Sequence, residues 1–82
     1  MSKKDKLIAK LLAATTEFKW SDLEALLKLL GYEKLEGKGS RVKFDNGRPG
    51  DMINLHKPHP QKEIKAYAVK QVKEKLVEAE LI

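Results

Sequence analysis

The chain has 82 residues, the size of one small domain, and it contains no cysteine, so disulfide bonds are excluded and a cytoplasmic location is expected. No apolar run approaches the roughly 20 residues that a membrane-spanning helix needs, so no membrane partner is expected. Seventeen Lys and Arg against 12 Asp and Glu give a net charge of +5, which favours a polyanion or an acidic protein as partner.

Two helices are predicted in the first part of the chain. Residues 3–14 carry apolar side chains at helical spacing, namely Leu7, Ile8, Leu11 and Leu12. A second helix is predicted to begin at Ser21, which as N-cap would form a capping box with Glu24, and to end at Gly31. Its apolar stripe consists of Leu23, Leu26, Leu27 and Leu30.

Three short strands and a last helix follow. The strands are predicted over residues 32–36, 40–44 and 52–56, with a strong turn signal at residues 45–50. Pro58 and Pro60 exclude regular structure from the next loop. A helix is predicted over residues 66–79, with inward-facing Val69, Val72, Leu76 and Ala79. The order predicts an α+β fold with two layers, in which helices cover one face of a three-stranded antiparallel sheet.

The alternation of side chains along a strand predicts which residues share the open face of this sheet. If Val42, Phe44, Ile53 and Leu55 face the helices, then their neighbours face solvent. The outer face would collect Arg41, Lys43, Asn54 and His56. Lys38 lies in the glycine turn at its edge, and Lys57 and His59 lie in the following loop.

These residue types suit a phosphodiester ligand and a proton transfer. Arg and Lys bind phosphate oxygens, and a histidine can act as a general base or acid. The simpler alternative is a polar sheet face whose cations are only solvated and whose histidines have no role. A metal site is not expected, because two histidines without cysteine supply too few ligands for zinc.

Other residues with reactive or aromatic side chains carry weaker signals. The sequence around Ser40 shows no pattern of a catalytic acid–base triad, so a hydrogen-bonding role is favoured over a nucleophilic one. Trp20 is expected in the core, with base stacking as the alternative, and Tyr32 and Tyr67 are open between the same two roles.

Two segments resemble the HicA toxin family of bacterial toxin–antitoxin modules. They are Gly-Ser-Arg-Val-Lys-Phe at 39–44 and His-Pro-Gln-Lys-Glu-Ile at 59–64, and the helix around residues 69–72 also fits. The resemblance spans about residues 20–81. It implies a double-stranded-RNA-binding-like fold, ribonuclease activity on messenger RNA, and a HicB-type antitoxin that covers the active face. Residues 1–17 are then predicted to be an N-terminal helical extension of a HicA-like domain over residues 18–82.

The chain departs from the family at Arg41, which stands where the family has a histidine after Gly-Ser. Arginine stays protonated and cannot act as a general base. Either His56 or His59 has taken over proton transfer, or the domain binds RNA or antitoxin without cutting; an inactivating replacement of the histidine is a third possibility.

The leading hypothesis is a metal-independent endoribonuclease that needs no cofactor. Its predicted catalytic residues are His56 and His59. Its predicted RNA- and phosphate-binding residues are Lys38, Ser40, Arg41, Lys43 and Lys57. The alternatives are a non-catalytic RNA-binding domain of the double-stranded-RNA-binding type, and a protein-interaction module whose basic face meets an acidic partner.

Overall fold

The computed structural model describes residues 2–48, 50, 52–58 and 61–82. The elements in chain order are α1 (Lys3–Ala13), β1 (Phe18–Lys19), α2 (Trp20–Leu29), β2 (Glu33–Glu36), β3 (Arg41–Asp45), β4 (Ile53–His56), β5 (Glu63–Ile64) and α3 (Ala66–Glu78). Strands β2, β3 and β4 form an antiparallel sheet in that order, and β1 pairs with β5 in a separate two-stranded sheet.

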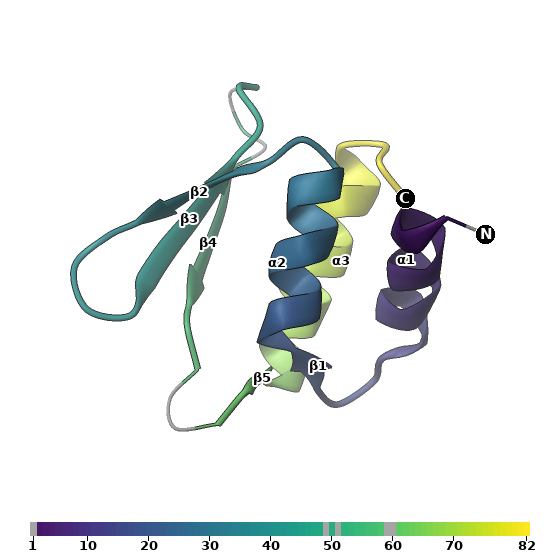
Figure 1. Cartoon of the computed structure of the whole chain (residues 1–82), viewed down its shortest axis with the longest axis horizontal. Coiled ribbons are helices and arrows are strands. Elements are labelled where there is room, and N and C mark those ends of the chain that lie inside the picture. Colours follow the sequence, from purple (N-terminus) through teal and green to yellow (C-terminus); the bar gives the residue numbers. More distant parts are fainter. Residues whose placement is uncertain (1, 49, 51, 59–60) are drawn as a thin grey trace.

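The elements are arranged in layers, with the three-stranded sheet on one side and α1 on the other (Figure 1). Helix α2 contacts β2 and helix α3 contacts β4, so both helices cover the same face of the sheet. Helix α1 packs against α2 and α3 on their far side. The predicted α+β fold, with helices on one face of a three-stranded antiparallel sheet, is confirmed.

The core lies between the sheet and the helices and confirms the predicted strand alternation. Val42 and Phe44 of β3 and Ile53 and Leu55 of β4 are all buried. The ring of Phe44 lies against that of Trp20, with centroids 6.0 Å apart and planes tilted by 56°. Trp20 is therefore a core residue. Since one face of β3 and β4 is held in this core, their alternate residues must face solvent.

The start of α2 differs from the prediction, because the helix begins at Trp20 and not after Ser21. Lys19 is at the N-cap position and makes no side-chain capping bond. The Trp20 amide instead donates to the Lys62 carbonyl at 2.8 Å, next to the β1–β5 pair. A tertiary backbone bond thus satisfies the Trp20 amide, one of the donors at the start of α2 that have no partner within the helix. The predicted end is confirmed, since Gly31 has a φ of +95°, which favours glycine.

Helix α1 is joined to the rest of the molecule by core packing and by hydrogen bonds. Leu7 and Leu11, one turn apart, belong to the common core, whereas Leu12, which continues the same apolar spacing, is 53% exposed. The ammonium of Lys73 in α3 donates to the Leu12 and Ala14 carbonyls at the end of α1. The boundary predicted at residue 17 stays a prediction.

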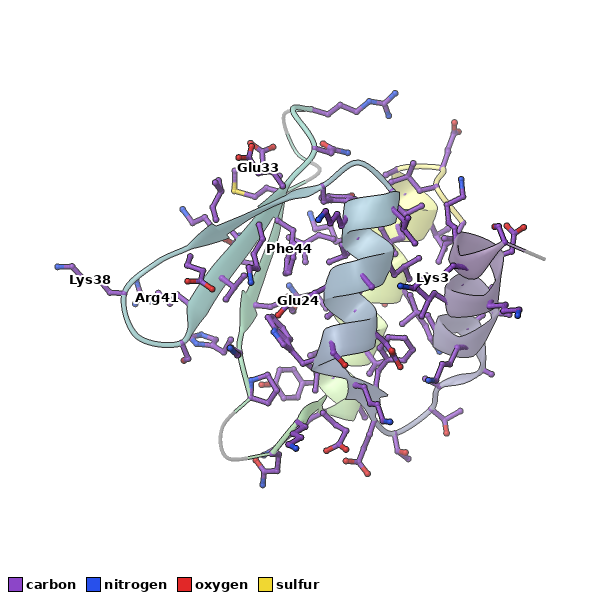
Figure 2. The ribbon with its side chains drawn as sticks, viewed as in Figure 1. Lys3, Glu24, Glu33, Lys38, Arg41 and Phe44 are labelled. Carbon is purple, nitrogen blue, oxygen red and sulfur yellow. The ribbon has the colours of Figure 1, made fainter. Side chains whose placement is uncertain are left out.

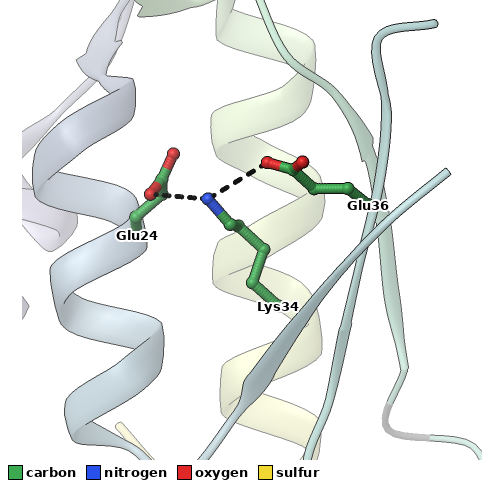
Figure 3. Close-up of polar contacts among 3 residues, drawn as sticks. All are labelled: Glu24, Lys34 and Glu36. Carbon is green, nitrogen blue, oxygen red and sulfur yellow. Dashed lines mark hydrogen bonds and ion pairs between the residues drawn. The ribbon is translucent and has the colours of Figure 1, made fainter. Parts of the chain in front are cut away.

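A surface ion-pair group joins β2 to α2 (Figure 3). Lys34 Nζ lies 3.3 Å from Glu24 Oε2 and 3.4 Å from Glu36 Oε1. The hydrogen bond and charge of Glu24, with a smaller contribution from Glu36, raise the pKa of Lys34 above its ordinary 10.5. A raised pKa means that Lys34 stabilises the fold while it is protonated, and that this contribution is lost as the pH rises through the raised value.

We therefore expect Lys34→Met to lower the free energy of unfolding by less than about 1 kcal/mol, because the pair is solvent-exposed. The difference in the free energy of unfolding between wild type and Lys34→Met should be present at neutral pH. It should shrink above the Lys34 pKa and in concentrated salt. Urea denaturation at several pH values would measure it, with Lys70→Met as control, since Lys70 has no ion pair with a described residue. A loss that is unchanged at high pH would contradict the electrostatic explanation.

Candidate functional site

The candidate site is the outer face of the three-stranded sheet, on the side away from α2 and α3. Arg41, Lys43, Asn54 and His56 are all exposed there, as the alternation predicts. The register places Arg41 opposite His56 and Lys43 opposite Asn54. Two segments that are distant in the sequence thus bring a guanidinium and an imidazole onto one surface.

Arg41 and His56 form one of the closely spaced pairs of the antiparallel ladder. The Lys57 amide donates to the Ser40 carbonyl at 2.7 Å, so Ser40 and Lys57 form a hydrogen-bonded pair. The next pair, Arg41 with His56, is then a non-hydrogen-bonded one, in which Cβ atoms lie about 4.5–5.5 Å apart. At this spacing both side chains can reach the same phosphate group.

Ser40 supplies a second contact to His56. Its Oγ lies 3.4 Å from His56 Nδ1, slightly longer than a usual N–H···O hydrogen bond of about 2.7–3.2 Å. When Nδ1 carries the proton and donates to Oγ, Nε2 is left unprotonated and can accept a proton from a ligand. This contact is compatible with the hydrogen-bonding role predicted for Ser40, which stays a prediction.

Cations surround this pair and are free to meet an anion. Lys38 projects from the β2–β3 loop at the tip of the sheet, at the same end as Arg41, while Phe44 points toward the helices (Figure 2). None of Lys38, Arg41, Lys43 and Lys57 forms an ion pair with any residue that the structure describes. The acidic residues Glu33 and Asp45 lie opposite each other in the ladder, at the other end of β2 and β3. Positive charge on this face is therefore concentrated at the Arg41 end.

Of the two predicted catalytic histidines, His56 is described by the structure, whereas His59 lies outside the described residues. Lys57 directly follows β4 and is exposed beside His56. The described part of the chain has no group of three or more His, Cys, Asp or Glu side chains arranged to hold a metal ion. It also contains no helix that is both long enough and apolar enough to cross a membrane.

Two hollows on the surface differ in volume and in the side chains that line them. A shallow hollow of about 320 Å³ lies over the outer sheet face and is lined by Arg41, Lys43, Asn54 and His56, with Val42 and Leu55. A larger groove of about 640 Å³ lies between α2 and β2 and is mostly apolar, with Trp20, Tyr32 and Phe44 among its lining residues. Size alone favours the groove, but it has neither histidine nor unpaired arginine, so the sheet face is the better candidate for phosphate chemistry.

Another hollow, of about 280 Å³, was not foreseen from the sequence. It continues the sheet face from His56 and Lys57 toward the first two turns of α3, where Tyr67 and Gln71 line it. The β1–β5 pair makes this possible, because it draws the segment before α3 back against the molecule. Strands of two residues give no recognisable alternation, so the sequence offered no signal for this contact.

Comparison with known proteins gives one match. A family model described as the HicA toxin of bacterial toxin–antitoxin systems matches residues 20–80, which include α2, the three-stranded sheet and α3. Helix α1 precedes the matched region. Searches of curated proteins and of solved structures give no significant match.

Proposed function

Because this chain belongs to the HicA toxin family, the toxin components of bacterial toxin–antitoxin pairs, we propose that it is an endoribonuclease that cleaves messenger RNA on the outer face of its sheet. The observation that carries the proposal is the closely spaced pair of Arg41 and His56, with Ser40 Oγ 3.4 Å from the histidine ring. This arrangement combines a fixed positive charge with a group that can move a proton.

The proposed reaction is a transesterification that releases the 3′ fragment of the RNA, whose new end is a 5′-hydroxyl. His56 Nε2 takes the proton from an RNA 2′-hydroxyl, and the 2′-oxygen attacks the adjacent phosphorus. The bond from phosphorus to the 5′-oxygen breaks, and that oxygen receives a proton from a general acid, for which His59 is the candidate. The products are a 2′,3′-cyclic phosphate and a 5′-hydroxyl. Arg41, Lys43 and Lys57 stabilise the negative charge that develops on the phosphate oxygens.

The family also implies a cognate antitoxin, and we propose that it is of the HicB type and covers the same face. The unpaired cations around Arg41 would then meet acidic side chains of the antitoxin. A partner bound in this way excludes RNA by occupying its site, so antitoxin and RNA should compete for the protein.

One observation favours a second function, namely RNA binding without cleavage. Arg41 occupies the position of the family histidine, and its guanidinium strengthens phosphate binding but cannot accept a proton. If His56 does not take over proton transfer, the same face remains a cationic RNA-binding surface.

The proposal is tested by incubating the purified protein with a defined RNA in EDTA and identifying the ends of any fragments. We expect cleavage that leaves 2′,3′-cyclic phosphate and 5′-hydroxyl ends. RNA binding without cleavage would support the second function. The absence of both binding and cleavage would contradict both functions and leave a protein-interaction module.

RNA affinity is expected to depend strongly on salt, because the proposed contacts are to phosphates. For single-stranded RNA, each phosphate contact contributes about 0.7 to the slope of log affinity against log salt, so Arg41→Ala or Lys57→Ala should reduce the slope by about that amount. Fluorescence anisotropy with a labelled 2′-O-methyl RNA, which lacks the attacking hydroxyl, would measure it.

Lys3→Ala is the matched control, since it removes the same charge from α1, on the far side of the molecule from Arg41 (Figure 2). It should leave the slope nearly unchanged. Equal effects of all three substitutions would show that net charge matters and the sheet face does not.

A further inference from the structure

The hollow at the end of β4 extends the candidate site and contains an aromatic side chain. His56 and Lys57 line the hollow on the sheet side, and Tyr67 and Gln71 line it on the α3 side. A nucleic acid with one phosphate at Arg41 and His56 would therefore pass this hollow with a neighbouring nucleotide.

Tyr67 is unlike the other aromatic residues of the chain. The sequence has one Trp, two Tyr and two Phe. Phe18, Trp20, Tyr32 and Phe44 are buried in the core, whereas Tyr67 is 71% exposed. Its ring therefore contributes little to the core, and one of its faces can be covered by a ligand.

The position of Tyr67 is fixed relative to the sheet. It is the second residue of α3, whose first turn is closed by bonds from the Ala68 and Val69 amides to the Lys65 carbonyl, both 3.0 Å. One turn further on, Gln71 Nε2 donates to the Asn54 carbonyl of β4 at 3.1 Å. These contacts fix the backbone of Tyr67 at the hollow that His56 also lines, so no backbone rearrangement is needed to present the ring to a ligand.

Side chains of both charges line the hollow around Tyr67. Lys57 lies next to His56, on the side of the sheet cations, and Lys65 lies at the start of α3. Glu63, half-buried in β5, also lines the hollow. Its carboxylate disfavours a phosphate nearby but can accept a hydrogen bond from an amino group of a base. Lys57 and Lys65 also line the hollow, so charge alone does not select its ligand; the exposed ring of Tyr67 favours a base, because a base can stack on an aromatic face and a phosphate cannot.

We propose that Tyr67 is a stacking platform for an unpaired base of the RNA, next to the phosphate bound at Arg41 and His56. The inference rests on the proposed function and narrows its substrate class to RNA that is single-stranded or looped at this point. A base inside a duplex is already stacked on both faces, whereas an unpaired base can stack on an exposed aromatic ring.

The test compares Tyr67→Ala and Tyr67→Phe with wild type. The ligands are a single-stranded 2′-O-methyl RNA containing 2-aminopurine and a blunt duplex of the same sequence. Loss of stacking costs about 1–3 kcal/mol per base, so Tyr67→Ala should weaken single-strand binding about 5- to 150-fold. Tyr67→Phe keeps the ring and should bind within about threefold of wild type. Quenching of 2-aminopurine fluorescence should occur with wild type and Tyr67→Phe only. Duplex binding should be equal for all three proteins.

Val77→Ala is the matched control, because Val77 is an apolar residue of the same helix that is 55% exposed and does not line the hollow. It should bind both RNAs like wild type. If wild type binds the single strand and Tyr67→Ala binds it equally well, the stacking inference is overturned while the proposed function stands. An equal loss for single strand and duplex would also overturn it. If wild type binds no RNA, the proposed function itself fails, and the inference fails with it.

Discussion

Replacement of His56 by alanine is expected to lower the rate of RNA cleavage by about 10²–10⁴-fold, the usual effect of losing a general base. His56→Gln should lose as much, because an amide fills a similar space but cannot take up the proton. Both variants should keep the fold, since His56 is exposed and belongs to no core contact. Single-turnover cleavage of a defined RNA would measure the rates.

Two further measurements separate catalysis from binding. The affinity of the His56 variants for a 2′-O-methyl RNA should stay close to that of wild type, since Arg41 and Lys43 remain in place. Ser40→Ala should lower the cleavage rate less than His56→Ala, because it removes only the contact to Nδ1. Cleavage at the wild-type rate by both His56 variants would contradict the assignment of His56 and leave His59 as the candidate base.

Replacement of Phe44 by alanine is expected to have the largest effect on stability. Phe44 is buried between the sheet and α2 and packs on Trp20. Truncation of a buried Phe costs about 3–5 kcal/mol, a large share of the roughly 5–15 kcal/mol that stabilises a typical domain. Chemical denaturation would measure the loss, and Trp20, the one tryptophan of the chain, provides the fluorescence signal next to the new cavity.

Lys43→Ala is the matched control, because it changes the preceding residue on the opposite face of the same strand. We expect it to change the free energy of unfolding by no more than about 0.5 kcal/mol, as at most surface positions. It should nevertheless weaken RNA binding. If Lys43→Ala destabilised the protein as much as Phe44→Ala, the assignment of the two strand faces would be wrong.

The sheet face could be predicted from the sequence because one physical rule determines it. Val42 and Phe44 alternate with Arg41 and Lys43, and burial of the first pair requires exposure of the second. The same rule placed His56 on the face of Arg41, although the two residues are 15 positions apart. This alternation rule can be applied without knowing the conformation of the loops between the strands.

The remaining features depend on tertiary contacts that leave little trace in the local sequence. The β1–β5 pair has two residues in each strand, and beside it the Trp20 amide bonds to the Lys62 carbonyl, where α2 begins before the predicted Ser21 cap. The packing of α1 leaves Leu12 exposed although it continues an apolar pattern. The hollow around Tyr67 is lined by residues of β4, β5 and α3, which the fold brings together and which Gln71 links by its bond to the Asn54 carbonyl. For that reason Tyr67 could not be distinguished from a core tyrosine at the outset.

The most direct test of the central claim, that proton transfer in this chain belongs to His56 and not to residue 41, is a comparison of wild type with Arg41→His on the same RNA in EDTA. We expect wild type to cleave the RNA and Arg41→His to cleave it no faster, because the substitution removes a permanent charge from the phosphate site. An inert wild type together with an active Arg41→His variant would contradict it. That result would mean that the chain keeps the scaffold of the family but lacks its catalytic base.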